Sequence, residues 1–362
     1  MVLDLDLSGA LLSKVHAVAE LAEREHAETD RPDGTPARTL AAVAEHRLDR
    51  LAINDVDLPA FAEVLMGVAT AFPAAAVVLT MHAAVLHLAS ASSDTATRAR
   101  VLDGGRLWGF GAAPPAEEAR ARVEKHADGA RLRGALRRVS GAGLVGGLAA
   151  LVPYGEKNAV LLVETDRAGV EIEPSWQSAG LRASSTRVVR FHDVAVTRAD
   201  VLALVVGAEE LPSWSTAMLG LVATAAGVAR RAARLSIERA RAVSDATTFR
   251  RDSGVALAAA IEEATAAMSI CRALAVRARR PSVDHVELLA AKRAATSAAE
   301  RSVVAARAVV GMDGFEPPHP LERLSRDALG LRHFFPVDPV ALELSWSVLG
   351  LRSLDPSDGR SR

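Results

Sequence analysis

The spacing of hydrophobic residues divides the chain into three zones. From residue 1 to 105, apolar positions recur with the 3.6-residue period of amphipathic helices, as in "ALLSKVHAVAELAEREHA" and "LAAVAEHRLDRLAI". From 106 to 207 the period becomes two, in short runs separated by Gly, Pro, Asn and Asp, which predicts strands. From 208 to 352 the helical period returns, and residues 353–362 form a polar tail.

The order of these zones predicts the fold class. Short strands that follow one another without crossover helices favour an antiparallel sheet or barrel over a parallel sheet. The third zone holds four apolar helical segments joined by short links, which is typical of an antiparallel bundle: 213–243, 255–279, 283–310 and 338–351. We therefore expect an α+β multidomain protein with an N-terminal helical domain, a middle antiparallel β-domain resembling a barrel, and a C-terminal four-helix bundle.

One uncharged stretch raises the question of a membrane. Residues 64–93 contain no Asp, Glu, Lys or Arg, which is long enough for a span. Pro73 interrupts the stretch, and His82 and His87 dilute it, so we expect a buried helical hairpin. The acidic start "MVLDLDLSGALL" lacks the basic residues of a signal peptide, and we expect a cytoplasmic protein. The formal charge of −1 gives no electrostatic reason for binding nucleic acid or an anionic membrane.

Several short motifs have simple structural interpretations. "GAGLVG" at 141–146 matches G-x-G-x-x-G, but the run before it is basic and alternating, so a tight turn is expected instead of a dinucleotide fingerprint. His82 and His87 are five apart and do not share a helix face, and no metal site is expected. Cys271 is the one cysteine and lies in an apolar helical pattern, which predicts a buried side chain.

The segment "RHFFP" at 332–336 breaks the helical pattern near the C-terminus. It places Phe334 and Phe335 side by side before Pro336, although the chain has only eight Phe. Something must cover these rings, whether core, partner subunit or ligand. The preceding "LERLSRD" at 321–327 predicts a charged helix face with Glu322 paired to Arg326.

Three stretches resemble the acyl-CoA dehydrogenase family: "SWQSAGLRASSTRVVRFHDVAV" (175–196), "VVGMDGFEPPHPLERLSRDALG" (309–330) and "RAVSDATTFRRDSG" (241–254). The resemblance implies FAD between the β-domain and the bundle, with an acyl-CoA or acyl-carrier thioester against the flavin. A carboxylate would take the α-proton while a hydride passes to flavin N5. It also implies a dimer or tetramer, of like or unlike subunits, through the bundle, and an electron-transfer flavoprotein as electron acceptor.

The resemblance also assigns site residues. It places eight at the cofactor: Trp108, Phe110, Gly111, Ser140, Thr248, Phe249, Gly311 and Gly314. It places three at the substrate: Leu221, Phe334 and Phe335. Two departures weaken the FAD site, because Ala246 and Ala308 stand where the family has an Arg and a Gln.

The catalytic base is the largest departure. The family's Glu falls on Phe335, and the other position used for it falls on Thr247. The nearest titratable residues are Asp245 and His333, and His333 is the candidate surrogate base because imidazoles ionise near neutral pH. Three functions follow: an acyl-CoA dehydrogenase with a displaced base, a flavin-dependent monooxygenase on the same fold, or a non-catalytic subunit of a hetero-oligomer.

Overall fold

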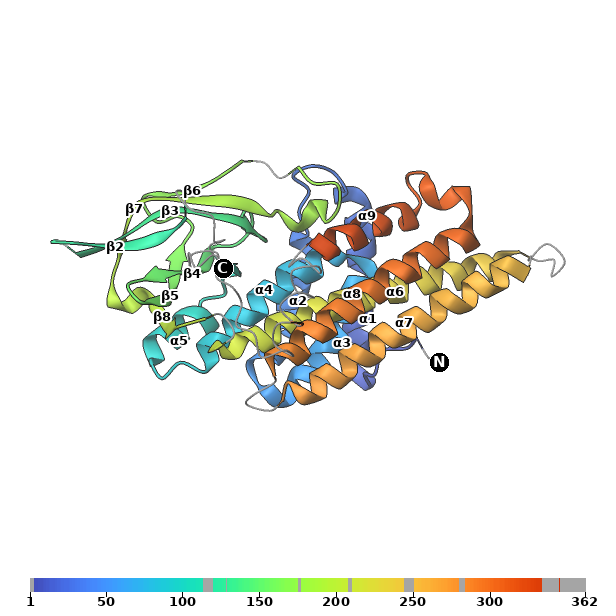
Figure 1. Ribbon diagram of the computed structural model, residues 1–362, viewed down its shortest axis with the longest axis horizontal. Coiled ribbons are helices and arrows are strands. Elements are labelled where there is room, and N and C mark those ends of the chain that lie inside the picture. The colour runs from blue at the N-terminus through green and yellow to red at the C-terminus, as the bar shows by residue number, and fades with distance from the viewer. Residues whose placement is uncertain are drawn as a thin grey trace, which may run out of the picture.

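The computed structural model describes residues 3–112, 120–127, 129–174, 177–207, 210–243, 251–279, 284–333 and 345. Helices occupy both ends of the chain, and a region of strands lies between them in sequence and at one end of the molecule (Figure 1). This arrangement confirms the predicted fold class. The exact domain boundaries stay a prediction.

The N-terminal part is helical. Its elements are α1 (Gly9–Thr29), α2 (Ala37–Glu45), the 3-10 helices η1 (Leu48–Ile53) and η2 (Asp55–Asp57), α3 (Leu58–Ala71), α4 (Pro73–Ser90) and α5 (Thr95–Leu102). Helix α4 is long and apolar enough to cross a membrane, but 94% of that window is buried inside the protein. The predicted hairpin is therefore confirmed, with α3 and α4 meeting at Pro73.

The middle region contains eight described strands: β1 (Trp108–Ala112), β2 (Arg122–His126), β3 (Gly129–Val139), β4 (Gly147–Tyr154), β5 (Lys157–Glu164), β6 (Val170–Ile172), β7 (Arg187–Val196) and β8 (Val201–Val205). They form two sheets, in the orders β1-β4-β5-β8 and β2-β3-β7-β6. Leu132 and Leu136 of β3 pack with Leu148 of β4, so the sheets share a core.

One strand pair departs from the antiparallel prediction. β1 and β4 are parallel, with Trp108 opposite Gly147, whereas the other described pairs in both sheets are antiparallel. Between these two strands the chain leaves the first sheet to form β2 and β3 in the second. A parallel neighbour needs such a long connection, which the period of the sequence alone does not reveal.

The C-terminal helices are α6 (Pro212–Ala242), α7 (Arg251–Arg277), α8 (His285–Val310), η6 (Met312–Phe315) and α9 (Pro320–His333). Helix α6 packs on α3 and α4 as well as on α7 and α8. At Gly227 a side chain would lie 2.5 Å from the Cβ atom of Ala69, so the glycine permits this close contact. One hydrophobic core therefore joins the N-terminal and C-terminal helices. The helix predicted at 338–351 lies outside the described residues, apart from Ser345.

Candidate functional site

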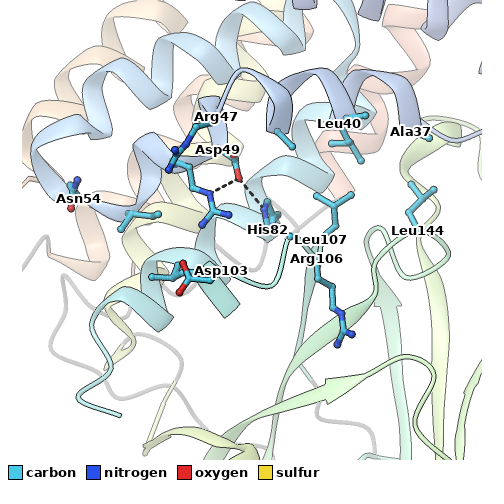
Figure 2. A pocket seen from close by; sticks show the side chains of 16 residues that line it. Ala37, Leu40, Arg47, Asp49, Asn54, His82, Asp103, Arg106, Leu107 and Leu144 are labelled. Carbon is cyan, nitrogen blue, oxygen red and sulfur yellow. Dashed lines mark ion pairs between the residues drawn. The ribbon is translucent and has the colours of Figure 1, made fainter. Parts of the chain in front are cut away.

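A cavity of about 710 Å³ lies between the N-terminal helices and the start of the β region (Figure 2). Its apolar wall comes from separate elements and includes Leu40, Ile53, Leu102, Leu107 and Leu144. Its polar wall includes Asp49 of η1 and His82 of α4. A volume of this order is typical of small-molecule sites.

Asp49 and His82 are neighbouring buried polar residues in this wall. His82 Nδ1 accepts a hydrogen bond from the backbone N–H of Trp108 at 3.2 Å, so the proton of the neutral ring lies on Nε2. That nitrogen points to Asp49 Oδ2 at 3.5 Å. Arg50 Nε lies 3.4 Å from the same oxygen. Asp49 Oδ1 is buried and has no hydrogen-bond partner among the described residues.

The backbone before Asp49 explains how an acidic side chain became buried. The sequence predicts one helix over "LAAVAEHRLDRLAI", but α2 ends at Glu45 and Arg47 adopts a left-handed φ of 56°. The chain restarts as the 3-10 helix η1, which turns Leu48 and Ala52 into the core together with Asp49. Sequence reasoning missed Asp49, because burial of a polar residue depends on this break.

His87 makes a second, separate pair. A cavity of about 520 Å³ adjoins the first at Ile53 and Asn54 and contains His87 and Asp55. His87 Nε2 lies 3.2 Å from Asp55 Oδ1, and Nδ1 contacts the hydroxyl of Thr216 on α6. Burial lowers the pKa of His87, and the Asp55 charge opposes that shift. The two histidines thus serve different carboxylates, and no cluster of three metal-ligating side chains occurs among the described residues.

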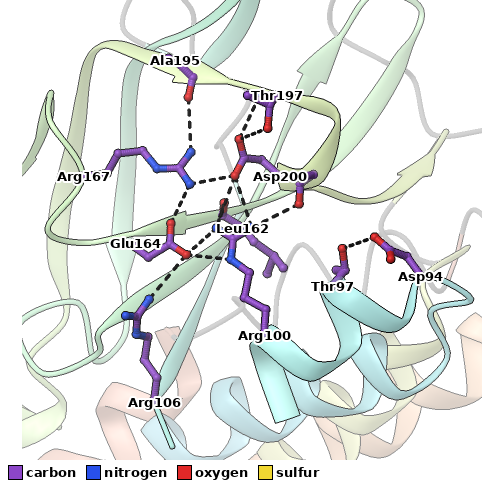
Figure 3. Close-up of polar contacts among 11 residues, drawn as sticks. Asp94, Thr97, Arg100, Arg106, Leu162, Glu164, Arg167, Ala195, Thr197 and Asp200 are labelled. Carbon is purple, nitrogen blue, oxygen red and sulfur yellow. Dashed lines mark hydrogen bonds and ion pairs between the residues drawn. The ribbon is translucent and has the colours of Figure 1, made fainter. Parts of the chain in front are cut away.

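An ionic network joins α5 and Arg106 to the β region (Figure 3). Arg106, which lines the cavity, lies 3.5 Å from Glu164 at the end of β5. Arg100 of α5 donates to Glu164 at 2.8 Å. Arg167 donates to Glu164 at 2.7 Å and to the buried Asp200 at 2.8 Å. Because these contacts join α5 to the β region, they fix one wall of the cavity.

Two of the predicted flavin contacts lie inside hydrophobic cores. Trp108 is fully buried and packs among residues of α4, β4 and β5. A side chain at Gly111 would meet Leu136 and Val139 at 3.0 Å, so this position faces the interior between the sheets. Phe110 is half-buried. Trp108 and the Cβ direction of Gly111 therefore face hydrophobic cores, and their assignment to the flavin stays a prediction.

Ser140 has the chemistry expected at a flavin. It lies in the turn after β3 and is 1% exposed. Its oxygen accepts a hydrogen bond from Thr186 at 3.2 Å, and its own proton has no acceptor among the residues that the structure describes. The "GAGLVG" segment forms the turn that joins β3 to β4, with Gly141 at a φ of 79°, as predicted. The role assigned to Ser140 at a flavin, like those assigned to Trp108 and Gly111, stays a prediction.

The remaining assigned residues are spread over the helices. Gly311 ends α8 at a φ of 79°, and Gly314 is buried in η6. Leu221 is 2% exposed inside the helical core. At its neighbour Gly220, a side chain would lie 2.4 Å from Thr80 of α4, so α4 and α6 leave no channel there.

The structure describes only some of the residues assigned as the catalytic base or as part of the "RHFFP" segment. His333 is the last residue of α9 and is exposed. Thr248, Phe249, Phe334 and Phe335 lie outside the described residues, as do Thr247 and Asp245. Their assigned roles stay predictions.

The two most specific stretches of the resemblance contact each other. The Asp327 carboxylate of α9 accepts a hydrogen bond from the backbone N–H of Leu181 at 2.6 Å. Arg326 donates to the Ala179 carbonyl at 3.0 Å and, as predicted, to Glu322 at 2.7 Å. These contacts of Arg326 and Asp327 therefore hold α9 against the segment before β7.

Comparison with known proteins agrees with this architecture. Residues 217–335 match the sequence profile described as "Acyl-CoA dehydrogenase, C-terminal domain". A glutaryl-coenzyme A dehydrogenase in complex with glutaryl-CoA superposes with a TM-score of 0.83 at 17% identity, covering 96% of this chain and 97% of its own. The chain has the acyl-CoA dehydrogenase fold.

Other proteins with this fold have different names and ligands. KijD3 in complex with FMN and dTDP-3-amino-2,3,6-trideoxy-4-keto-3-methyl-D-glucose has a TM-score of 0.82 at 21% identity, with 98% of each chain covered. A 3-HSA hydroxylase from Rhodococcus sp. RHA1 has a TM-score of 0.79 at 19% identity, covering 96% of this chain and 99% of that one. A sequence comparison with curated proteins finds no match. The acyl-CoA dehydrogenase fold therefore does not by itself choose the reaction.

Proposed function

We propose that this protein is a flavin-dependent oxidoreductase. The observation that carries the proposal is the buried Ser140 hydroxyl at the turn after β3, whose proton has no acceptor among the described residues. Support comes from the fold, which covers nearly the whole chain and is shared with a structure that contains FMN. FAD is the cofactor that the sequence resemblance implies.

The first candidate reaction is α,β-dehydrogenation of an acyl thioester. The match of residues 217–335 to the acyl-CoA dehydrogenase profile supports it. When bound, the flavin would supply the hydride acceptor. Of the described residues, Ser140 would hold the polar edge of the ring, and His333 is the surrogate base nearest the expected position. Electrons would pass on to an electron-transfer flavoprotein.

A second candidate, monooxygenation, is favoured by two observations. The family's base position holds Phe335, and a hydroxylation at the flavin requires no removal of an α-proton. In addition, Gly220 of α6 packs directly on Thr80 of α4, and Leu221, which the resemblance assigns to the substrate, is buried. These contacts support a substrate other than a long acyl chain between α4 and α6.

The third hypothesis, a non-catalytic subunit, requires a surface on which a partner subunit packs. Helix α7 contains an apolar window of which only 28% is buried within the chain, and Val255 and Val276 are largely exposed. A second subunit packed on α7 would cover this surface, whether or not the chain is active. Ala246 and Ala308, which replace expected cofactor ligands, support the inactive alternative.

The visible spectrum of the purified protein separates these functions. A flavin spectrum near one equivalent supports a flavoenzyme, and a colourless protein that stays colourless after incubation with FAD and FMN contradicts it. Bleaching by butyryl-CoA without oxygen indicates dehydrogenation. Oxygen uptake with chemically reduced flavin and transfer of oxygen to an added substrate indicates monooxygenation. Ser140→Ala should weaken flavin retention about tenfold, since it removes one hydrogen-bond donor, whereas Ser215→Ala, on the surface of α6, should not.

A further inference from the structure

The edge strands of the two sheets differ in how they are protected. β1 and β8 are the edges of one sheet, and β2 and β6 are the edges of the other. The unpaired backbone of an edge strand can bind another chain, so proteins usually shorten, charge or cover such strands. β2 carries Arg122, Glu124 and Lys125, β6 has only three residues, and Trp108 of β1 is fully buried against α4. Three of the four described edges are therefore protected.

β8 has none of these protections. Its five residues, Val201–Val205, carry no charge and no proline. Leu204 is 45% exposed, and Val206, directly after the strand, is 65% exposed. Among the described residues, no hydrogen bond joins the backbone of residues 202–205 to an element other than β5. The outer edge of β8 is therefore an apolar strand that can pair with another strand.

The order of residues in β8 indicates which strand that is. The sequence Val-Leu-Ala-Leu-Val reads the same in both directions. In an antiparallel pair of two copies about a two-fold axis at Ala203, Leu202 of one copy lies opposite Leu204 of the other, and Val201 lies opposite Val205. Like side chains then pack together, and such cross-strand contacts stabilise a sheet. A two-fold contact of this kind uses the same surface on both copies.

We propose that β8 is an interface between two copies of this protein, which pair antiparallel about Ala203. The pairing joins two four-stranded sheets into one sheet of eight strands. The strand is short, and the register with β5 shifts at Leu202, since Val160 is opposite Ala203 and Leu161 is opposite Val201. The contact is therefore smaller than that of a permanent dimer, and it forms at high protein concentration. The proposal does not depend on a flavin or on the apolar surface of α7.

Cysteine cross-linking of the full-length protein tests this register. Cys271 is the one natural cysteine and is buried, so an introduced thiol reacts without background. In Ala203→Cys the two thiols meet at the axis, where opposite Cβ atoms are about 4.5–5.5 Å apart. In Val206→Cys they lie about 20 Å apart, because this position is three residues from the axis. Oxidation with copper phenanthroline should give at least about tenfold more disulfide-linked dimer for Ala203→Cys, although position 206 is the more exposed one.

Further variants control for folding and for other contacts. Leu204→Lys, added to Ala203→Cys, should abolish the cross-link, because a charge on an edge strand opposes pairing. Val276→Lys, on the exposed surface of α7, is the matched control and should leave the cross-link unchanged. If Ala203→Cys does not fold, a mixture of Val201→Cys and Val205→Cys proteins provides the second test. The register predicts cross-links between these two variants and not within either one.

The possible outcomes separate the occupants of this edge. A dimer that requires position 203 and is lost in Leu204→Lys supports the interface. No dimer, or a dimer that forms more readily at position 206, would overturn it and would indicate that another protein or another part of this chain covers β8. These results do not involve the flavin spectrum, so the interface can fail while the proposed oxidoreductase function stands, and the reverse.

Discussion

His26 and Asp327 come from opposite ends of the chain and lie together in the protein interior. His26 Nε2 is 3.3 Å from Asp327 Oδ2, and the side chains are 9% and 3% exposed. His26 Nδ1 is 3.0 Å from the Ala71 carbonyl oxygen, so both ring nitrogens face oxygen acceptors. The ring also stacks on Phe72 at a centroid distance of 4.5 Å.

Removing the Asp327 charge should destabilise the protein strongly. Asp327→Asn removes the negative charge from a buried carboxylate that accepts a hydrogen bond from the Leu181 N–H at 2.6 Å, and losing a hydrogen bond to a charged group costs about 1.5–3 kcal/mol. Urea unfolding monitored by circular dichroism would measure this as a lower midpoint. The exposed pair of His192 and Glu171, at 2.9 Å, is the matched control. Glu171→Gln should change stability by less than about 1 kcal/mol, and equal effects of the two substitutions would argue against a buried ionic contact.

Gly180→Ala should be among the most damaging small substitutions. An added Cβ atom would lie 1.9 Å from the carbonyl oxygen of Arg326, and backbone must move to admit it. We expect a loss of about 3 kcal/mol, since overpacking against backbone is poorly relieved. Gly155 provides the control: its φ is 63°, but no atom of the described residues would lie within 4 Å of an added Cβ atom. Gly155→Ala should cost only about 1–2 kcal/mol of backbone strain; a larger loss there would contradict the packing argument.

Because Lys292 is buried, the free energy of unfolding should increase as the pH rises in the alkaline range. The ammonium is 1% exposed, and burial lowers its pKa from 10.5 to about 8. Between these values the unfolded chain binds a proton that the folded chain does not, so rising pH favours folding by up to about 3 kcal/mol. Lys292 Nζ donates to Thr296 at 2.9 Å and to the Leu331 carbonyl at 3.2 Å, which keeps the group buried in both protonation states.

The comparison with Lys292→Met isolates this contribution. Because methionine carries no charge, the variant should be more stable than the natural protein at pH 7, and its advantage should shrink between pH 8 and 10.5. Unfolding midpoints at several pH values would give the difference between the two proteins, in which other titrating groups cancel. A difference that does not vary with pH would refute the assignment.

The Arg167 network should matter most above pH 4. Burial raises the pKa of Asp200, but hydrogen bonds from Arg167 and Thr197 hold it below its ordinary value of 3.8. Arg100 has the same effect on Glu164, whose pKa lies below 4.5 in the folded protein despite its burial. The carboxylates therefore stabilise the fold above these pH values, and that stabilisation is lost as the pH falls through them.

Arg167→Met tests the network directly. The variant should lose about 1–2 kcal/mol at pH 7, and this loss should be smaller at pH 3, which lies below the ordinary pKa values of both carboxylates. Thermal unfolding at the two pH values would measure it. Arg122→Met, which removes the exposed contact of Arg122 with Glu124 at 2.7 Å, should have little effect at either pH. A loss that is equally large at pH 3 would indicate a packing role for Arg167.

The sequence by itself determined the order of helices and strands, because hydrophobic periodicity is a local property. It also predicted the buried hairpin around Pro73 and the pairing of Glu322 with Arg326, since both depend on neighbours within one helix or one turn. The resemblance to acyl-CoA dehydrogenases also predicted the fold. Two of the stretches that carry it, 175–196 and 309–330, contact each other in the structure.

Only the tertiary structure decided which of these residues face a cavity. The resemblance assigns Trp108 and Gly111 to the flavin. In the structure the Trp108 side chain packs in a hydrophobic core, and a Cβ atom added at Gly111 would contact core residues. Asp49 carried no sequence signal, because its burial depends on the left-handed turn at Arg47 and on a partner from a distant element, His82. Long-range packing sets these orientations, and local patterns of polarity do not encode it.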